Sequence, residues 1–452
     1  HDDKTFFFFF LIQVPRLINK VRGPINEPGD SSTATGIGNS KPKQQFSIGG
    51  LINVPDHLRK LDEQAFTPLL ISIGPIHRSN PKLQTMKRCK AKFFDCFIQR
   101  ANTNFELLKT TIRVKEEEIR SYYAETIVSS ISSDDFVTMI LVDGMFILEY
   151  FLRESNPHLV ENDPMIAEWM PPILKFDLVL LENQLPFFVL EMLFELANFP
   201  AELELKPLSL RELAFVFFRC YNFQMKELED FNAEIEHFTD LVRLFYLSEQ
   251  LPDRRSGGAK LSYSATQLHE AGVKLKGVKF DEEMGRYRGH RGFLDIRFDF
   301  KNGVLAIPCM KLNDKKIRVI RNIIALEQSL YVGHAYVTDF FVILDFLINT
   351  SKDVDLLCDK GILVNYLGDS NAAALAFNNL NTNILWGYMN LEYSKICEDL
   401  NAFYKKRWHK WKATLWRQYF STPWRAASTS AAIIFLVLTA IQTVCSLKST
   451  KW

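Results

Sequence analysis

An uncharged stretch near the C-terminus, residues 426–447, constrains this chain more than any other feature of its sequence. At about 1.5 Å of rise per residue, a helix of this length just spans a hydrocarbon core of about 30 Å. The stretch also contains hydroxyl and amide side chains, among them Ser428, Thr439 and Gln442. A buried core helix or a surface-lying helix therefore remains an alternative. We expect a single transmembrane helix over residues 426–447, close to the end of the chain.

The segment before this stretch, residues 404–425, combines positive charge with aromatic rings. Basic side chains beside amphipathic rings suit the headgroup region of a bilayer. The same pattern suits nucleic acid, but its position next to an apolar stretch favours membrane lipid as the partner. We therefore expect a juxtamembrane helix and no nucleic-acid partner. The residues predicted to lie at the membrane interface are Lys405, Lys406, Arg407, Trp408, Trp411, Trp416, Trp424 and Arg425.

The charges that flank the stretch predict its orientation. Seven Lys or Arg residues lie in the 21 residues before it and two follow it, so the positive-inside tendency places the body in the cytoplasm. The seven cysteines show no C-x-x-C spacing, which favours reduced thiols and agrees with a cytosolic body. Residues 6–12 are at the short limit for a signal-peptide core, so the opposite orientation is the alternative. Plasma membrane and endoplasmic reticulum both remain possible.

The body of the chain carries a different charge from its tail. The chain holds 54 Lys or Arg and 53 Asp or Glu residues; nine of the basic residues and none of the acids fall in residues 400–452. The remainder therefore has 45 basic and 53 acidic residues, a net charge of −8. The positive charge of the tail is a local feature, and the body is not a general polyanion binder.

Apolar residues at helical spacing predict a mainly α fold: a compact multi-helix body with a small β-hairpin, followed by the single C-terminal transmembrane helix. Asp134 and Asp135 are predicted to cap a buried helix over residues 136–153. An apolar stripe predicts another helix over residues 231–245. Alternation over residues 293–300, followed by Asn302-Gly303, predicts a hairpin with a type I′ turn over residues 293–309. The predicted parts are a disordered lead (1–45), a helical domain (46–250), a linker (251–262), a second helical part (263–403), the juxtamembrane helix (404–425) and the transmembrane helix (426–447).

Several short motifs follow one another in a fixed order along the body. They include ISIGPIH at residues 71–77, VDGMFILE at 142–149, LLENQLPFF at 180–188, RNIIALEQ at 321–328 and YFSTPW at 419–424. On these motifs the chain resembles the plant domain-of-unknown-function 247 family, from about residue 46 to the C-terminus. The resemblance implies no established enzymatic activity. Some grass members act as pollen-side determinants of self-incompatibility, which implies recognition between proteins.

Polar residues inside these apolar motifs are the candidate site. A charge there is costly unless it is paired or hydrogen-bonded, so we interpret these residues as a buried polar network that fixes the packing. The alternative is that the acids, with His77 and His334, perform acid–base or metal chemistry. The residues of the predicted network are Asp143, Glu149, Glu182, Asn183, Gln184, Arg321, Asn322, Glu327 and Gln328.

Motifs typical of enzymes are absent from the sequence. There is no H-E-x-x-H, Walker, G-x-G-x-x-G, G-x-S-x-G or kinase signature, and no two histidines stand four residues apart. We therefore predict no catalytic residue, no metal, no cofactor and no enzymatic activity. The predicted function is a membrane-anchored protein for protein–protein recognition or scaffolding, with an unknown protein partner. The alternative is a membrane-tethered enzyme of unfamiliar type that uses buried carboxylates.

Overall fold

The structure is a computed structural model of the 452-residue chain. The residues that it describes are 52–156, 159, 169–200, 209–229, 231–248, 251–256, 258–281, 286–287, 291–384, 388–406 and 423–449. The predicted lead over residues 1–45 lies outside them. Residues 46–452 form one unit, and they are mainly helical with several small sheets.

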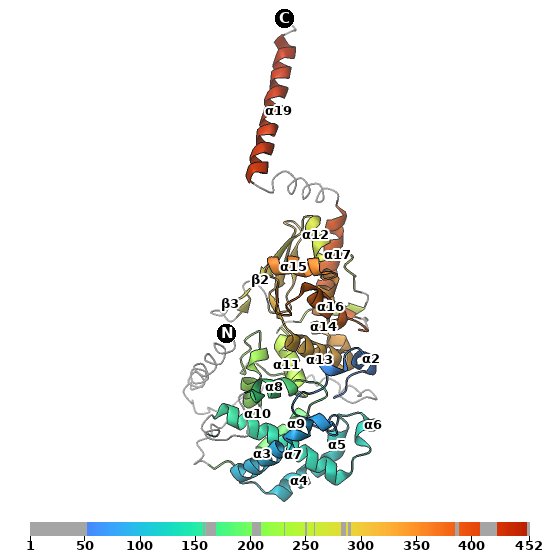
Figure 1. Ribbon diagram of the computed structural model, residues 1–452, viewed down its shortest axis with the longest axis vertical. Helices are drawn as coiled ribbons and strands as arrows, with labels where there is room; N and C mark the ends of the chain where they lie inside the picture. Colours follow the sequence, from blue (N-terminus) through green and yellow to red (C-terminus); the bar gives the residue numbers. More distant parts are fainter. Residues whose placement is uncertain are drawn as a thin grey trace, which may run out of the picture. The chain divides into compact units, whose positions relative to one another are not determined.

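A buried helix, α7 (Ser133–Ser155), organises the N-terminal part of the body. Its residues from Phe136 to Arg153 are mostly buried because helices α3, α4, α9 and α10 pack around it (Figure 1). The cap differs from the prediction: Ser132 is the N-cap, its hydroxyl accepts a hydrogen bond from the Asp135 amide at 3.2 Å, and the helix begins at Ser133. The other helices of the N-terminal part are α2 (Asp56–Arg59), η1 (Glu63–Ala65), η2 (Pro81–Met86), α3 (Lys87–Ala101), α4 (Phe105–Val114), α5 (Glu116–Arg120), α6 (Glu125–Val128), α8 (Met170–Asp177), α9 (Phe187–Glu195), α10 (Leu210–Phe217) and η5 (Arg219–Tyr221).

Two long helices, α13 and α14, lie in the second part of the body, and α11 (Phe238–Tyr246) packs against α13. Only the second half of the predicted helix 231–245 is helical, because His237 caps α11 and the residues before it form a loop. Figure 1 shows α11, α13 and α14 next to one another. The helices of this part are α12 (Ala265–Glu270), α13 (Asp314–Leu330), η6 (Val332–His334), α14 (Tyr336–Leu347), α15 (Ser351–Asp359), α16 (Ser370–Leu380) and α17 (Leu391–Lys405).

The described residues form four small sheets, and the largest of them has three strands, in the order β2-β6-β5, with β2 parallel and β5 antiparallel to β6. One face of it packs on α17, where Phe298 and Phe300 lie with their ring centroids 5.7 and 5.8 Å from that of Phe403. The other sheets pair β1 with β9, β3 with β4 and β7 with β8. The strands are β1 (Arg254–Ser256), β2 (Lys274–Val278), β3 (Phe280–Asp281), β4 (Arg286–Tyr287), β5 (Arg297–Asp299), β6 (Val304–Pro308), β7 (Met310–Leu312), β8 (Leu363–Asn365) and β9 (Tyr388–Asn390).

The predicted hairpin exists as β5 and β6, but β5 covers only Arg297–Asp299 of the predicted strand 293–300, and the turn is not of type I′. A type I′ turn needs positive φ at both central residues, and only Gly303 has it, at 62°, while Asn302 does not. Four residues separate the strands, and the Asp299 carboxylate closes the loop by accepting bonds from the amides of Lys301 and Asn302 at 3.0 and 3.2 Å. The Asp299 side chain therefore selects a longer turn than the Asn-Gly pair alone predicts.

One hydrophobic core cluster runs from Ile52 to Phe403 and includes residues of both predicted helical parts. A smaller cluster joins the segment around Val54 and Phe66 to Leu181 and to Leu326 of α13. The segment predicted as a linker contains β1, whose Arg255 pairs with Met389 of β9. The two predicted parts are thus joined by shared packing and by strand pairing.

The prediction of a transmembrane helix is wrong. Helix α19 (Pro423–Ser449) covers residues 426–447, yet among the described residues no helix is both long and apolar enough to cross a membrane. Hydroxyl and amide side chains interrupt its apolar run, and the hydroxyls of Thr439 and Thr443 donate back to helix carbonyls at 2.8 Å. The prediction relied on the length of the stretch and its lack of charge, and it gave too little weight to these polar side chains.

The residues predicted for the membrane interface are distributed over several segments. Lys405 and Lys406 stand at the end of α17, where the Lys406 ammonium lies 4.3 Å from the ring centroid of Phe300. Trp424 and Arg425 belong to α19, and Trp424 is exposed. The remaining four, Arg407, Trp408, Trp411 and Trp416, lie outside the described residues.

Candidate functional site

The loop between α8 and α9 carries the centre of the candidate site. Its residues from Leu178 to Leu185 are buried, so their backbone groups need partners inside the protein. Asn183 supplies two of them: its amide donates to the carbonyls of Ile71 and Asp177, each at 3.0 Å, and its oxygen accepts from Ile73 at 2.7 Å. These bonds hold the loop against the segment around residues 71–73.

Gln184 fixes the same loop from its other side. Its amide nitrogen donates to the carbonyls of Leu178 and Leu180 at 2.7 and 2.8 Å, and its oxygen accepts from the Phe238 amide at 2.9 Å. All three hydrogen-bonding positions lie in the buried interior. The two amide side chains thus replace the backbone pairing that a helix would give this segment.

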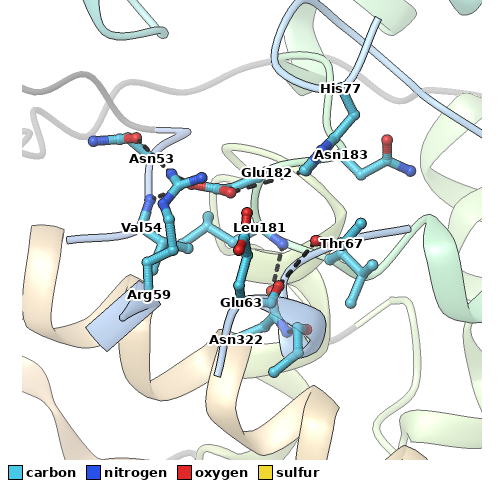
Figure 2. Close-up of polar contacts among 12 residues, drawn as sticks. Asn53, Val54, Arg59, Glu63, Thr67, His77, Leu181, Glu182, Asn183 and Asn322 are labelled. Carbon is cyan, nitrogen blue, oxygen red and sulfur yellow. Dashed lines mark hydrogen bonds and ion pairs between the residues drawn. The ribbon is translucent and has the colours of Figure 1, made fainter. Parts of the chain in front are cut away.

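Glu182 projects from the loop toward the motif segment that contains Val54 and Arg59 (Figure 2). Its Oε1 accepts a hydrogen bond from the Val54 amide at 3.0 Å and forms an ion pair with the Arg59 guanidinium. Its Oε2 has no hydrogen-bond partner among the described residues and lies 3.9 Å from Nε2 of His77. That separation is too long for a direct hydrogen bond.

His77 reaches this position with one ring nitrogen already engaged. A hydrogen bond with the Phe66 carbonyl involves Nδ1, because Nε2 is the nitrogen without a partner among the described residues. The neutral tautomer therefore carries its proton on Nδ1 and presents the lone pair of Nε2 to Glu182. The side chain of Glu182 is fully buried and that of His77 is 12% exposed.

Burial shifts the two pKa values in opposite directions. Desolvation raises the pKa of Glu182 from 4.5 to about 7, against the opposing charge of Arg59 and the Val54 amide, while Asp56 and Glu63 raise it further. Desolvation and the charge of Arg59 lower the pKa of His77 from 6.5 to about 4. Near neutral pH the pair is therefore a partly protonated carboxyl facing a neutral imidazole, a combination that acid–base chemistry uses.

A second buried carboxylate, Asp143 of α7, anchors the neighbouring turn. Its Oδ1 pairs with the Lys90 ammonium, which also donates to the Ser72 carbonyl, and its Oδ2 accepts from the Gly74 amide at 2.8 Å. Gly74 has φ of 72°, and a Cβ there would lie 2.8 Å from the Gln184 carbonyl oxygen. Burial raises the pKa of Asp143, and Lys90 opposes the rise.

Asp177 holds the same segment from the end of α8. Its carboxylate accepts hydrogen bonds from three successive amides, those of Leu69, Leu70 and Ile71, at 2.8, 2.7 and 2.9 Å. Burial nevertheless raises its pKa to about 6. The sequence analysis missed this residue, because an acid at the end of an apolar helix gives no signal of the amides it meets.

Glu149 of α7 is buried between two arginines. Arg100 of α3 donates to both carboxylate oxygens, at 2.9 and 3.1 Å, and Arg153 donates to Oε1 at 2.7 Å. The Arg153 guanidinium also lies 4.4 Å from the ring centroid of Phe93. This cluster links α3 to α7 and leaves neither carboxylate oxygen unpaired.

The four predicted residues of α13 lie in different surroundings. Asn322 accepts from the Leu181 amide at 2.8 Å and donates to the Ala65 carbonyl at 2.9 Å. Arg321 pairs with Asp62 at 2.6 Å. Glu327 forms a buried ion pair with Arg243 at 3.2 Å, and Gln328 is half-buried.

Burial raises the pKa of Glu327, and Arg243 is the strongest group opposing the rise. The carboxylate of Glu327 also accepts hydrogen bonds from the amide and hydroxyl of Thr338, each at 2.7 Å, and from the Val337 amide at 3.3 Å. His334 contributes its backbone carbonyl, which accepts from Arg243 at 3.2 Å. The predicted residues are thus distributed over several clusters, one of which contains His77.

The cationic partners of these acids were not predicted. Arg59, Lys90, Arg100 and Arg243 each pair with an acid that the sequence analysis selected. Arg59 and Glu182 stand 123 residues apart, so no local pattern connects them. Among the described residues, no group of three or more His, Cys, Asp or Glu side chains is placed to hold a metal ion.

Comparison with known proteins gives relatives but no activity. A family model described as "Plant protein of unknown function" matches residues 51–438. The chain is 26% identical over 432 residues to UPF0481 protein At3g47200 of Arabidopsis thaliana, covering 88% of this chain and 86% of that protein. It is 23% identical over 486 residues to the putative UPF0481 protein At3g02645 of the same plant, covering 87% and 89%. No solved structure matches the chain.

Proposed function

The chain belongs to the DUF247 family of plant proteins, as its motifs predicted, and we propose that it acts by protein recognition or scaffolding and not by catalysis. The observation that carries the proposal is that the polar side chains of the motifs form hydrogen bonds inside the body. Glu149, Asn183, Gln184 and Asn322 hydrogen-bond to segments distant in sequence, and their contacts hold loops and helices in place. Motif residues used in this way preserve a rigid framework, which leaves recognition to the surface.

One surface of this framework displays apolar side chains. Leu107 and Val114 of α4 are 49% and 77% exposed and stand seven positions apart, which places them on the same side of the helix. Exposed apolar groups on a rigid helix are common at protein interfaces. This face of α4 is the first surface to test for a protein partner.

The second candidate function is catalysis by the Glu182–His77 pair. Oε2 of Glu182 and Nε2 of His77, which have no hydrogen-bond partner in the described part of the chain, favour it together with the carboxyl pKa near 7. An acid and a base whose pKa values are displaced by burial are a common property of active sites. The two functions differ in what the isosteric change Glu182→Gln does to a protein that is still folded.

The test compares purified full-length variants in two assays. The immobilised wild type is used to capture proteins from plant extract, and these proteins are identified and produced. The affinity of each purified protein for the purified chain is then measured. We expect Leu107→Asp/Val114→Asp to reduce the affinity without a change in Tm, and Leu375→Asp, at another exposed leucine, to leave it unaltered. We expect Glu182→Gln to retain the affinity below its own Tm.

The outcomes separate the two functions. If the wild type converts components of the extract and Glu182→Gln abolishes the conversion while circular dichroism and Tm show a folded protein, the chain is an enzyme and our proposal fails. Partners that bind the wild type, the α4 double variant and Leu375→Asp equally well would exclude the α4 face as the recognition surface.

A further inference from the structure

Three lysines and one thiol meet at an end of the three-stranded sheet. Strands β2 and β6 run parallel with Val278 opposite Pro308, so the next residues, Lys279 and Cys309, follow side by side. The Cys309 amide donates to the Val278 carbonyl at 2.8 Å and fixes this arrangement. Lys311 stands two residues beyond Cys309 on the extended chain, which places both side chains on the same side. Lys279 and Lys311 are both exposed.

Lys316 approaches the same place from the first turn of α13. Its ammonium lies 4.4 and 4.9 Å from the ring centroids of Phe223 and Phe293. The side chain is half-buried, and desolvation lowers its pKa to about 7, with Lys311 lowering it further. Phenyl faces attract an ammonium group but replace only part of its lost hydration.

The described part of the chain supplies no anion to this cluster. None of Lys279, Lys311 and Lys316 forms an ion pair with a described residue. Burial raises the pKa of the Cys309 thiol, and the charges of all three lysines act on that thiol in the opposite direction. Among the described residues, three cations therefore act on this thiol without a compensating carboxylate, an unfavourable arrangement that a bound anion would relieve.

We propose that Lys279, Lys311 and Lys316 form a binding site, next to Cys309, for a phosphate group on a partner protein. This inference rests on the proposed recognition function and gives that function a ligand chemistry. A phosphate monoester carries close to two negative charges and three acceptor oxygens near neutral pH, which match three ammonium groups around one thiol better than a single carboxylate does. The local charge agrees: residues 274–318 contain twelve Lys or Arg and six Asp or Glu, whereas the whole chain has a net charge of +1.

The thiol of Cys309 reports on the site. Without an anion, the three lysines favour the thiolate, which is the form that reacts with iodoacetamide. A bound phosphate dianion opposes that effect and raises the pKa of the thiol. A rise of about 0.5 in the pKa reduces the thiolate fraction about three-fold, and the alkylation rate falls with it.

The experiment measures alkylation of each cysteine in the full chain by peptide mass spectrometry, at constant ionic strength. The probes are inorganic phosphate, a phosphoserine hexapeptide, its unphosphorylated twin, and vesicles containing phosphatidic acid. We expect the phosphopeptide to slow alkylation of Cys309 about three-fold in a saturable manner, and its twin to leave the rate unchanged. Cys96, half-buried on α3, is the internal reference.

Two variants control the site. Lys279→Gln/Lys311→Gln changes only exposed side chains and is expected to abolish the protection, while Lys276→Gln, exposed on β2, is expected to preserve it. The proposed site is refuted if no phosphate probe slows the alkylation of Cys309. It is also refuted if the alkylation is slowed equally in the double variant. Protection by inorganic phosphate or vesicles without protection by the phosphopeptide overturns the assignment to a partner protein. Neither failure alters the α4 affinity test, so the proposed function is judged separately.

Discussion

Glu182 and His77 make a sharp prediction about how stability depends on pH. The folded protein holds the carboxyl pKa at about 7 instead of 4.5 and the imidazole pKa at about 4 instead of 6.5. Between pH 4.5 and 6.5 the folded pair therefore carries one proton, on Glu182, and the unfolded pair also carries one, on His77. Because proton uptake is equal in the two states, the pair gives no pH dependence in this window.

Each residue alone makes the free energy of unfolding depend on pH, and the two dependences have opposite signs. The raised pKa of Glu182 gives stability that is present below pH 4.5 and is lost as the pH rises through 7. The lowered pKa of His77 gives stability that is present above pH 6.5 and is lost as the pH falls through 4. Each pKa departs from its ordinary value by about 2.5, which at about 1.4 kcal/mol per pH unit corresponds to about 3 kcal/mol.

Substituting one residue of the pair leaves only the pH dependence that the other residue gives to the free energy of unfolding. In Glu182→Gln we expect the free energy of unfolding, relative to wild type, to rise by about 3 kcal/mol between pH 4.5 and 6.5. In His77→Asn, whose amide imitates Nδ1 toward the Phe66 carbonyl, we expect a fall of similar size. Other groups titrate equally in all the proteins and cancel in these differences.

The assay is urea unfolding of the full chain at half-unit pH steps from 4 to 7.5, followed by circular dichroism. The double variant Glu182→Gln/His77→Asn is the control, and its curve is expected to run parallel to that of the wild type. A Glu182→Gln curve parallel to wild type between pH 4.5 and 6.5 would refute the displaced pKa values and, with them, the acid–base reading of the pair.

Three further substitutions test the buried contacts, each read out as the change in the free energy of unfolding. Glu149→Gln leaves the buried Arg153 and the half-buried Arg100 facing a neutral amide, and we expect a loss of about 3–5 kcal/mol; a loss below about 1 kcal/mol would mean that the cluster is hydrated. Asp177→Asn exchanges an acceptor of backbone amides for a donor, and we expect a loss of about 1–3 kcal/mol, with the aspartate's own titration near pH 6 disappearing from the profile. Gly74→Ala adds a Cβ at positive φ against a carbonyl oxygen, so a loss of at least about 1 kcal/mol is expected, and an unchanged Tm would contradict the tight turn.

Local patterns in the sequence were sufficient to predict much of the helical body. The apolar run of α7 predicted a buried helix, because a helix that is apolar on all sides needs neighbours on all sides. The hairpin was predicted from alternation and Asn302-Gly303, but its turn type was not, since the Asp299 side chain competes for the loop amides. The C-terminal helix was predicted as transmembrane from its length and lack of charge, but among the described residues no helix is long and apolar enough to cross a membrane.

The sequence by itself determined the family, the mainly helical class and the choice of acids that stand in apolar segments, because motif order, periodicity and burial cost are all local properties. Only the tertiary structure decided what these acids meet. Glu182 pairs with Arg59, 123 residues away in the sequence, and also faces His77. Glu327 pairs with Arg243, 84 residues away. An ion pair buried between distant segments leaves no periodicity in the chain, since the fold alone brings its two members together and desolvates them.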